Sequence, residues 1–418
     1  MRRVARKVRK TVKQPNPRTK SLEECHDDGE NFSKKASILA GAMAALGLAG
    51  QVQAGDIELP GTIIWSAYPT GTSGYSQAVA VGNVLQNNYN VNLRVVPGRN
   101  DVSRLSPLRS NRSHFSAGGS EAVYAQEAML NFGSREWGPL PIRTAMYNIS
   151  DGCSFTFVTA KDANIRTPED IAGKRVTYVQ GAPSLNNAMA ALLSYAELTW
   201  DDVRKVEVGG YGASIDAVID GRADVVGGSC NSAPFLRLES SPRGLHFPEF
   251  AHANEEAIER VRAHLPWYVP HVAIDGPTID ENEGIEVFTS PYPMLVTMHD
   301  QDEDVVYNMV KALHQHYDDY KDNAPGAVGW AMDRQQFENA FVPYHDGAVR
   351  YFKEIGVWSD AAEERQQLNL KRQELLMATW EAYVANAPRD ADAFAEGWMK
   401  ARAEALKAHD MVLIADRW

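Results

Sequence analysis

The chain has 418 residues, of which 44% are hydrophobic and 23% are charged, and its formal net charge is −12. This is the composition of a globular protein that is long enough to form two domains. The excess of acidic residues argues against nucleic acid as a partner, because nucleic-acid binding needs a basic surface.

The first 54 residues have the pattern of an export signal. Residues 1–20 carry nine basic residues and no acid, and residues 36–50 are small and apolar. Val52, Gln53 and Ala54 follow, with small side chains at the positions that a signal peptidase reads, so we expect cleavage after Ala54 and a periplasmic protein. Fifteen apolar residues are too few to span a bilayer, and no other stretch of the sequence approaches eighteen, so we expect no stable membrane insertion of the mature chain.

The first foldable unit lies between residues 62 and 88. Residues 63–67 predict a strand, residues 68–75 a glycine-rich loop and residues 76–87 a helix. A helix that begins after small residues presents unpaired N–H groups and the positive end of its dipole, which favours an anion in the loop. The alternative is a loop without a ligand, because small residues suit any tight strand-to-helix turn.

The same order of elements occurs twice in the chain. Strands are expected at residues 63–67, 93–96, 114–117, 175–179, 205–208 and 223–226, and helices at residues 76–87, 101–110, 187–196 and 213–220. Alternating strands and helices predict parallel sheets with helices on both faces, and ligands of such sheets bind beyond the carboxyl ends of the strands. The loops between these strands and helices therefore form the expected site.

We predict an α/β fold of two similar domains around a cleft, with a C-terminal helical extension. Two crossover strands are expected near residues 142–159 and 285–297. The expected domains are residues 55–148 with 290–358, residues 149–289, and an extension at residues 359–418.

The extension contains two helical patterns, at residues 361–386 and 390–409. The first carries an apolar stripe that consists of Leu368, Leu375, Leu376, Trp380 and Tyr383. Such a stripe is typical of a helix that packs against the body of the protein, and contact with a partner is the alternative.

Cys153 and Cys230 are the cysteines of the expected mature chain. Two cysteines in an oxidising compartment can form a disulfide or remain two buried thiols, and the sequence leaves both alternatives open. We expect the two residues to lie near each other, because the first begins a crossing strand and the second ends a strand at the same cleft edge.

No metal or cofactor is expected from the sequence. Asp300, Asp302 and Asp304 resemble the start of a calcium loop, but Val305 stands where a glycine is needed and Lys311 where a glutamate closes the site. The histidines and cysteines show no zinc-binding spacing.

Several segments together resemble the TAXI-type solute-binding proteins of tripartite ATP-independent periplasmic (TRAP) transporters. The resemblance covers residues 57–358 and rests on the first loop up to Tyr75 and on residues 95–98, 167–176, 220–224, 266–268 and 304–307. It implies a type II periplasmic binding protein, not an enzyme. Such a protein captures a small organic anion, such as a dicarboxylate, a keto acid or an amino acid, and delivers it to the permease subunits in the membrane.

The resemblance also implies the residues that face the ligand. They are Tyr68, Thr70, Thr72, Ser73, Tyr75, Arg99, Asn100, Ser120, Glu121, Ala182, Ser184, Asn186, Tyr211, Asn231 and Ser232. The sequence departs from the family at Pro183, which removes one backbone donor from a loop that is rich in glycine in many relatives, and at Arg99, where a glycine is usual.

Two other functions remain as alternatives. An exported enzyme could use the same two-domain fold, because a fold does not determine a function. Glu121 is the carboxylate that would act as its base, and otherwise Glu121 orients a ligand or caps a helix. The sequence contains no Gly-x-Ser-x-Gly motif, P-loop or zinc signature. A scaffold protein built on the C-terminal helices is the third interpretation.

Arg99 is expected to recognise the charge of the ligand, because a guanidinium beside backbone donors suits a carboxylate. Replacement of Arg99 by Ala should weaken the binding of an anionic solute roughly ten- to a hundred-fold and leave folding intact, and calorimetry measures this affinity. The alternative is a solvated arginine on the outer side of the loop. An unchanged affinity in a folded Arg99→Ala protein would remove this residue from the site.

Overall fold

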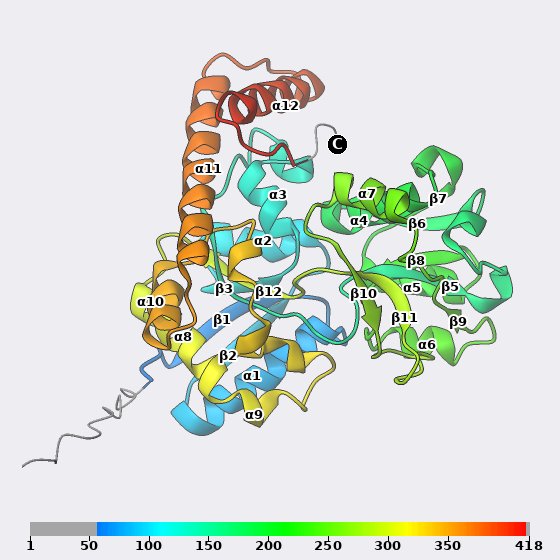
Figure 1. Cartoon of the computed structure of the whole chain (residues 1–418), viewed down its shortest axis with the longest axis horizontal. Coiled ribbons are helices and arrows are strands. Elements are labelled where there is room, and N and C mark those ends of the chain that lie inside the picture. Colours follow the sequence, from blue (N-terminus) through cyan, green and yellow to red (C-terminus); the bar gives the residue numbers. More distant parts are fainter. Residues whose placement is uncertain (1–56, 415–418) are drawn as a thin grey trace, which may run out of the picture. The chain divides into compact units, whose positions relative to one another are not determined.

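The computed structural model describes residues 57–414, so the expected export signal and its cleavage after Ala54 lie outside the described residues. Two five-stranded sheets with their helices form most of the described chain (Figure 1). A third sheet has two antiparallel strands, β10 (Val269–Ala273) and β11 (Ile285–Thr289).

The first sheet has the strand order β2-β1-β3-β12-β4. β1 pairs in parallel with β2 and β3, whereas β12 runs antiparallel to β3 and β4. The strands are β1 (Thr62–Ala67), β2 (Asn92–Pro97), β3 (Phe115–Gly118), β4 (Ile142–Tyr147) and β12 (Met294–Met298).

The second sheet repeats this plan with the order β7-β6-β8-β5-β9. β6 pairs in parallel with β7 and β8, whereas β5 runs antiparallel to β8 and β9. The strands are β5 (Thr156–Ala160), β6 (Arg175–Val179), β7 (Arg204–Val208), β8 (Val225–Gly228) and β9 (Leu245–His246).

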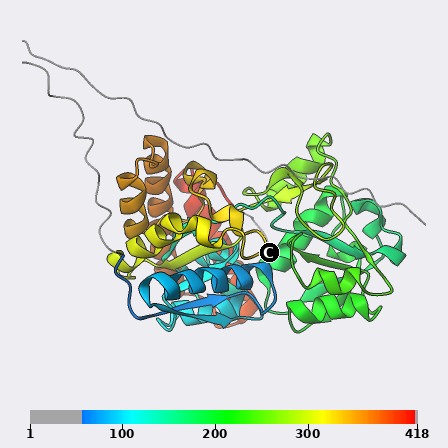
Figure 2. The same ribbon diagram turned by 90° about the horizontal axis from the view of Figure 1, so that it is seen from below.

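The antiparallel strand of each sheet, β12 in the first and β5 in the second, shows how the chain passes between the sheets. β5 is the first strand of the second sheet in chain order, whereas β12 is the last strand of the first sheet. The chain therefore crosses twice, at residues 148–155 and at residues 290–293. Figure 2 shows the elements of the two sheets in separate halves of the described chain. The predicted fold, two similar α/β units with two crossings and C-terminal helices, is confirmed.

The helices largely follow the sequence pattern. They are α1 (Ser73–Tyr89), α2 (Asp101–Arg109), α3 (Glu121–Glu127), α4 (Pro183–Tyr195), α5 (Tyr211–Ile219), α6 (Phe235–Glu239), α7 (Glu255–His264), α8 (Glu303–Gln315), α9 (Tyr317–Tyr320), α10 (Asp346–Glu354), α11 (Asp360–Val384) and α12 (Ala391–Ala408). Within residues 57–414, none of these helices is long and apolar enough to cross a membrane.

The two helices that follow the loops after β1 and β6 begin earlier in the chain than the sequence predicts. α1 begins at Ser73 because the side chain of Thr72 accepts a hydrogen bond from the N–H of Tyr75, which caps the helix. α4 begins at Pro183, whose fixed φ suits the first position of a helix.

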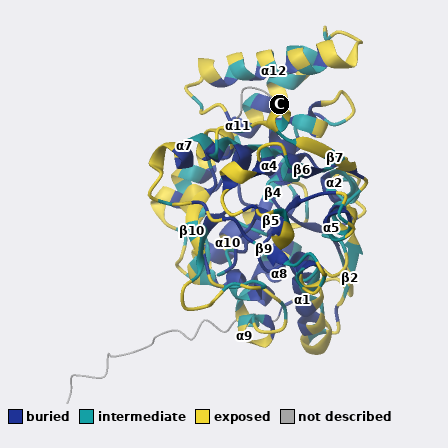
Figure 3. Ribbon diagram, turned by 90° about the vertical axis from the view of Figure 1, so that its right-hand side faces the viewer, coloured by how far each residue is buried: buried dark blue, intermediate teal, exposed yellow. Residues whose placement is uncertain are grey.

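Burial follows the layers of the fold. Figure 3 shows buried residues along the strands and exposed residues on the outward sides of the helices. In the first sheet, Trp65 and Phe115 are buried and pack edge to face with ring centroids 6.0 Å apart. In the second sheet, Val158, Val179 and Val226 are buried in a common core.

The C-terminal helix α11 docks mainly through polar side chains, which differs from the expected apolar stripe. Gln366 exchanges two hydrogen bonds with the backbone of Tyr344, and Asn369 donates to the carbonyl of Ala340. Leu368, by contrast, is 53% exposed. Trp380 and Tyr383 of the predicted stripe pack against aromatic rings of α12, and Leu376 of the stripe is buried. Amide side chains of α11 make this contact because the backbone groups of Tyr344 and Ala340 need hydrogen-bond partners.

Glu127 at the end of α3 holds both C-terminal helices. Its buried carboxylate accepts hydrogen bonds from Arg372 of α11 (2.6 and 2.9 Å) and from Arg402 of α12 (3.0 and 2.7 Å). Burial alone would raise the pKa of Glu127, but Arg402 and Arg372 lower it, so that the net shift is downward. The carboxylate is therefore charged at neutral pH.

Replacement of Glu127 by Gln should destabilise the protein by about 3–5 kcal/mol, because two buried guanidinium groups lose their carboxylate. Chemical denaturation measures this loss. Glu364→Gln, on an exposed part of α11, is the matched control and should change stability by less than about 0.5 kcal/mol. Equal stability of the two variants would show that Glu127 does not hold the helices.

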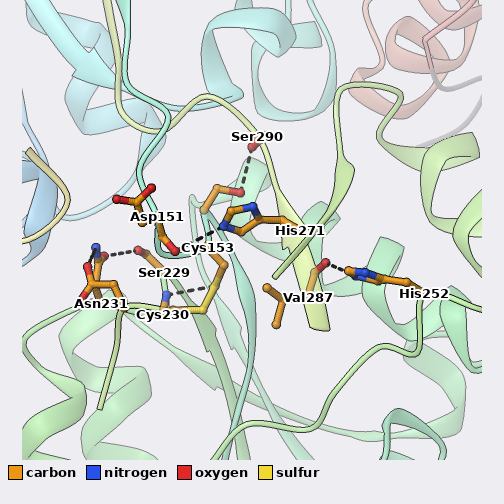
Figure 4. Close-up of a disulfide and its surroundings, with 11 residues drawn as sticks. Asp151, Cys153, Ser229, Cys230, Asn231, His252, His271, Val287 and Ser290 are labelled. Atoms are coloured by element: carbon orange, nitrogen blue, oxygen red, sulfur yellow. Dashed lines mark hydrogen bonds between the residues drawn. A yellow bond between two sulfur atoms is a disulfide. The ribbon is translucent and has the colours of Figure 1, made fainter. Parts of the chain in front are cut away.

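Cys153 and Cys230 form a disulfide, with their Cα atoms 5.1 Å apart (Figure 4). Cys153 lies in the first crossing segment and Cys230 follows β8, and the N–H of Cys230 donates to the carbonyl of Cys153 (3.3 Å). Both residues are buried against Ala273 and Val287 of the third sheet. The bond therefore ties the first crossing to the loop that ends β8, which settles the alternative that the sequence left open.

Loss of this bond should cost about 4 kcal/mol, because the bond closes a long loop in the unfolded chain. The sequence separation of the two residues is 77. Denaturation with and without reductant measures the effect. The double variant Cys153→Ser and Cys230→Ser should resemble the reduced protein and should not respond to reductant, and a parent protein that is equally stable in both conditions would contradict this prediction.

Candidate functional site

A cavity lies between the two sheets, at the ends of their parallel strands. Its volume is about 90 Å³. The loops after β1, β2 and β3 contribute one side, and the loops after β6, β7 and β8 contribute the other. Residues of both crossing segments complete the wall. The lining residues are Tyr68, Pro69, Thr72, Arg99, Asn100, Asp101, Arg104, Gly119, Ser120, Glu121, Ser154, Phe155, Val179, Ala182, Ser184, Leu185, Ala188, Tyr211, Gly228, Ser229, Tyr268, Ser290, Pro291 and Tyr292.

Local capping holds the loops of the first half in place. The side chain of Asn100 accepts from the N–H of Ser103, and the hydroxyl of Ser103 accepts from the N–H of Asn100. This reciprocal capping box starts α2 directly after β2. It places the first turn of α2 at the cavity.

Arg104 of α2 is the buried cation of the site, with 4% of the residue exposed. Its Nη2 atom lies 2.5 Å from a carboxylate oxygen of Asp101, and its Nε atom donates to Glu121 over 2.9 Å. The guanidinium also lies over the ring of Tyr68, 4.0 Å from the centroid. Burial lowers the pKa of Arg104, but Glu121 and Asp101 raise it, and the net shift is upward. The guanidinium is therefore charged and held in one orientation.

Glu121 begins α3 and is 1% exposed. Besides Arg104, its carboxylate accepts from the N–H of Gly119 (2.6 Å). A Cβ atom at Gly118 would lie 2.6 Å from Glu121, so this loop needs glycine for the carboxylate to fit. Burial raises the pKa of Glu121, which Arg104 opposes, and the net shift is upward. The contacts are those of an orienting group, the role that the sequence left as the alternative to a base.

Asp101 reaches across the cavity. One oxygen pairs with Arg104, and the other accepts from the N–H (2.7 Å) and the hydroxyl (2.6 Å) of Ser184 in the first turn of α4. Asp101 is 2% exposed. Two further links join the halves, since Asn100 donates to the carbonyl of Gln180 (3.4 Å) and Asn187 donates to the hydroxyl of Tyr124 (2.7 Å). Hydrogen bonds from one half to the other thus surround the cavity.

Aromatic rings form much of the remaining wall. The rings of Tyr68 and Tyr292 lie 5.0 Å apart, and Tyr211 and Tyr268 are also in the lining. Burial raises the pKa of Tyr292 to about 12 and also raises the pKa values of the other three phenols. All four hydroxyl groups therefore remain protonated at neutral pH and can donate hydrogen bonds.

The cavity brings together many of the residues that the sequence assigned to the ligand. Its lining includes Tyr68, Thr72, Arg99, Asn100, Ser120, Glu121, Ala182, Ser184 and Tyr211. Arg99 is exposed and lines the cavity. Ligand contact of these residues stays a prediction.

The other assigned residues lie outside the lining. Asn186 bonds to both the N–H and the carbonyl of Val179, and Asn231 bonds to Ser229 and Asp275. The remaining assigned residues are Thr70, which is exposed, Ser73, which is buried at the start of α1, Tyr75, which is partly buried in α1, and Ser232, whose hydroxyl accepts from Tyr211 (3.3 Å).

Sequence reasoning missed Asp101 and Arg104. Both lie in a helix that the pattern placed at the carboxyl end of a strand, and their spacing of three residues puts them on one face of it. That spacing was the available signal. Ser290 and Tyr292 had no such signal, because they come from the second crossing, whereas Tyr268 lies in the segment 266–268 that contributed to the family resemblance without being assigned to the ligand.

Metal ligands are not gathered in the described part of the chain. Within residues 57–414, no group of three or more His, Cys, Asp or Glu side chains is placed to hold a metal ion. The polar groups of the cavity are two guanidinium groups, two carboxylates, the amide of Asn100, hydroxyl groups and a helix N-terminus, which can bind a small polar molecule by hydrogen bonds.

Residues 67–356 match the model of the NMT1-like family. The chain belongs to the NMT1-like family. The match covers the strands of both five-stranded sheets from the end of β1 onward and stops before α11. No curated protein matches this NMT1-like chain in sequence.

Solved structures show distant likeness to the NMT1-like chain. An arginine-binding protein from T. maritima is 14% identical, with a TM-score of 0.36 over 60% of this chain and 94% of that protein. The alkanesulfonate-binding protein from Xanthomonas axonopodis pv. citri, bound to MOPS, is 11% identical, with a TM-score of 0.40 over 73% and 96%. The aliphatic sulphonate binding protein from Escherichia coli is 12% identical, with a TM-score of 0.39 over 66% and 84%. Likeness of this degree carries no argument about the ligand.

Replacement of Arg104 by Met should destabilise the protein by about 3–5 kcal/mol at neutral pH, because the buried carboxylates of Asp101 and Glu121 lose their cation. A carboxyl group whose pKa is raised in the folded state contributes stability at low pH and loses it as the pH rises through that pKa. The deficit should therefore shrink as the pH falls towards about 4. Denaturation at several pH values measures it.

Arg94→Met, at an exposed position of β2, is the control and should show neither effect. A deficit for Arg104→Met that is independent of pH would contradict the assignment to buried carboxylates.

Proposed function

We propose that this protein is an extracytoplasmic solute-binding protein that captures a small organic anion and delivers it to a TRAP-type permease in the membrane. The observation that carries the proposal is the cavity between two α/β units of the same plan, lined from both sides by loops at the ends of parallel strands. A site divided in this way can close on a small molecule when the two units move together.

The donors of the cavity support an organic anion as the ligand. Arg104, the first turn of α4 at Ser184 and four protonated phenols converge on one space, and Arg99 lines the same cavity. Guanidinium groups and backbone N–H groups at helix N-termini stabilise carboxylates. The ligand is then a dicarboxylate, a keto acid or an amino acid.

Closure of the cleft would require two domains that move relative to each other. We propose that residues 55–148 with 290–358 form one domain and residues 149–289 the other, with the crossings at residues 148–155 and 290–293 as the hinge. Residues 359–418 form the extension. The disulfide between Cys153 and Cys230 supports an oxidising compartment such as the periplasm, and the sequence resemblance to TAXI-type proteins supports the TRAP permease.

Titration calorimetry of the mature protein with glutamate, succinate and 2-oxoglutarate tests the proposal. We expect micromolar or tighter binding of at least one acid and no chemical change of that acid, which NMR of the mixture detects. Product formation would favour the exported enzyme instead. Absence of binding to every acid would contradict an organic anion as the ligand.

Replacement of Tyr211 by Phe should weaken the binding of that acid by about three- to ten-fold, because one protonated hydroxyl of the cavity is lost. Tyr178→Phe is the matched control, since Tyr178 packs on Trp200 outside the cavity. Equal affinities of the two variants in calorimetry would remove Tyr211 from the site.

A further inference from the structure

The first backbone N–H group of α4 donates its hydrogen bond to a residue on the opposite side of the cavity. Ala182 is the N-cap residue and provides no side-chain hydrogen bond, and Pro183 has no N–H group. Ser184 therefore supplies the first backbone donor of the helix. The acceptor of this donor is the carboxylate of Asp101, which belongs to α2.

Three kinds of donor converge on this one carboxylate. It receives the backbone N–H and the hydroxyl of Ser184 on one oxygen and the Nη2 group of Arg104 on the other, over 2.7, 2.6 and 2.5 Å. A ligand with a carboxylate group needs the same set of donors. The receptor for a carboxylate is thus complete, and a side chain of the protein fills it.

We propose that Asp101 occupies the position of the ligand carboxylate and that the ligand displaces it from Ser184 and Arg104. This inference rests on the proposed function, because it assumes an organic acid as the ligand. Exchange of the Asp101 carboxylate for the ligand carboxylate leaves the number of carboxylates paired with Arg104 unchanged.

Glu121 makes this exchange feasible. Its contact with the Nε atom of Arg104 and its hydrogen bond from Gly119 lie within the first half of the site. These contacts do not involve Asp101, so they keep the guanidinium in place when Asp101 leaves. Asp101, by contrast, links the two halves, so its contact with Ser184 holds the ligand-free cleft closed.

The inference predicts that replacement of Asp101 by Asn strengthens the binding of acids. The variant removes the competing charge and keeps the size of the side chain, and the affinity for glutamate, succinate or 2-oxoglutarate, whichever the parent protein binds, should rise about ten-fold or more. Asp220→Asn removes an equal charge at an exposed position and should leave the affinity unchanged.

Small-angle X-ray scattering of the ligand-free proteins gives a second measurement. Asp101→Asn should have a larger radius of gyration than the parent protein, because the link across the cleft is weakened. Glu121→Gln should keep the radius of the parent protein, because Glu121 contacts its own half in the described contacts. Equal radii of gyration for Asp101→Asn and the parent protein would contradict the inference that Asp101 holds the ligand-free cleft closed.

Ser184→Ala tests the same contact from the other side, at a partly buried position where folding is at little risk. The variant loses the hydroxyl donor and keeps the backbone N–H donor of residue 184, so its ligand-free radius of gyration should increase by less than that of Asp101→Asn. An unchanged radius of gyration would contradict the inference.

The outcomes separate this inference from the proposed function. If the parent protein binds an acid and Asp101→Asn binds it equally or more weakly, Asp101 is not a competitor and the inference fails, while the proposed function stands. If neither protein binds any of the acids, the proposed function fails and the inference falls with it.

Discussion

The buried guanidinium of Arg104 is the group on which the geometry of the site depends. An arginine that is 4% exposed must be neutralised, and the two carboxylates that surround it come from the starts of α2 and α3. The two helices follow β2 and β3, which lie on either side of β1 in one sheet, so the charge requirement fixes their first turns relative to each other. Arg104 pairs with only one oxygen of Asp101, so the other oxygen can accept hydrogen bonds from Ser184 in the other half. The ion pair on one side of the cavity is thus linked directly to the opposite side.

The exchange of antiparallel strands between the two sheets explains why the cavity lies where it does. β5 and β12 take equivalent positions in sheets of the same order, and this arrangement forces the chain to cross twice beside the carboxyl ends of the parallel strands. Residues of both crossings therefore form part of the wall, as Ser154 and Ser290 do. The disulfide at Cys153 anchors the first crossing to the loop after β8, so that the segment expected to bend during closure is fixed at one end.

The C-terminal helices show that periodicity alone does not determine how a helix docks. The pattern of α11 carried a stripe of leucines and aromatic residues, and the prediction of packing against the body followed from it. In the structure, amides and the charged contact of Arg372 with Glu127 make most of that interface, while Trp380 and Tyr383 pack against α12. A helix pattern indicates which residues share a face, but the partner surface decides which face is used, and that surface here presents backbone groups and one buried carboxylate.

The sequence by itself determined the two α/β units, the crossings, the ends of strands at which the cavity lies and several residues of the cavity wall, such as Ser120 and Tyr211. These features follow from local periodicity and from turn residues, which act over a few positions of the chain. Only the tertiary structure decided that Arg104 is the buried cation, that Arg99 is exposed and that Asp101 meets Ser184. Burial and charge pairing depend on residues that are far apart in the chain, and no local pattern records which of them meet.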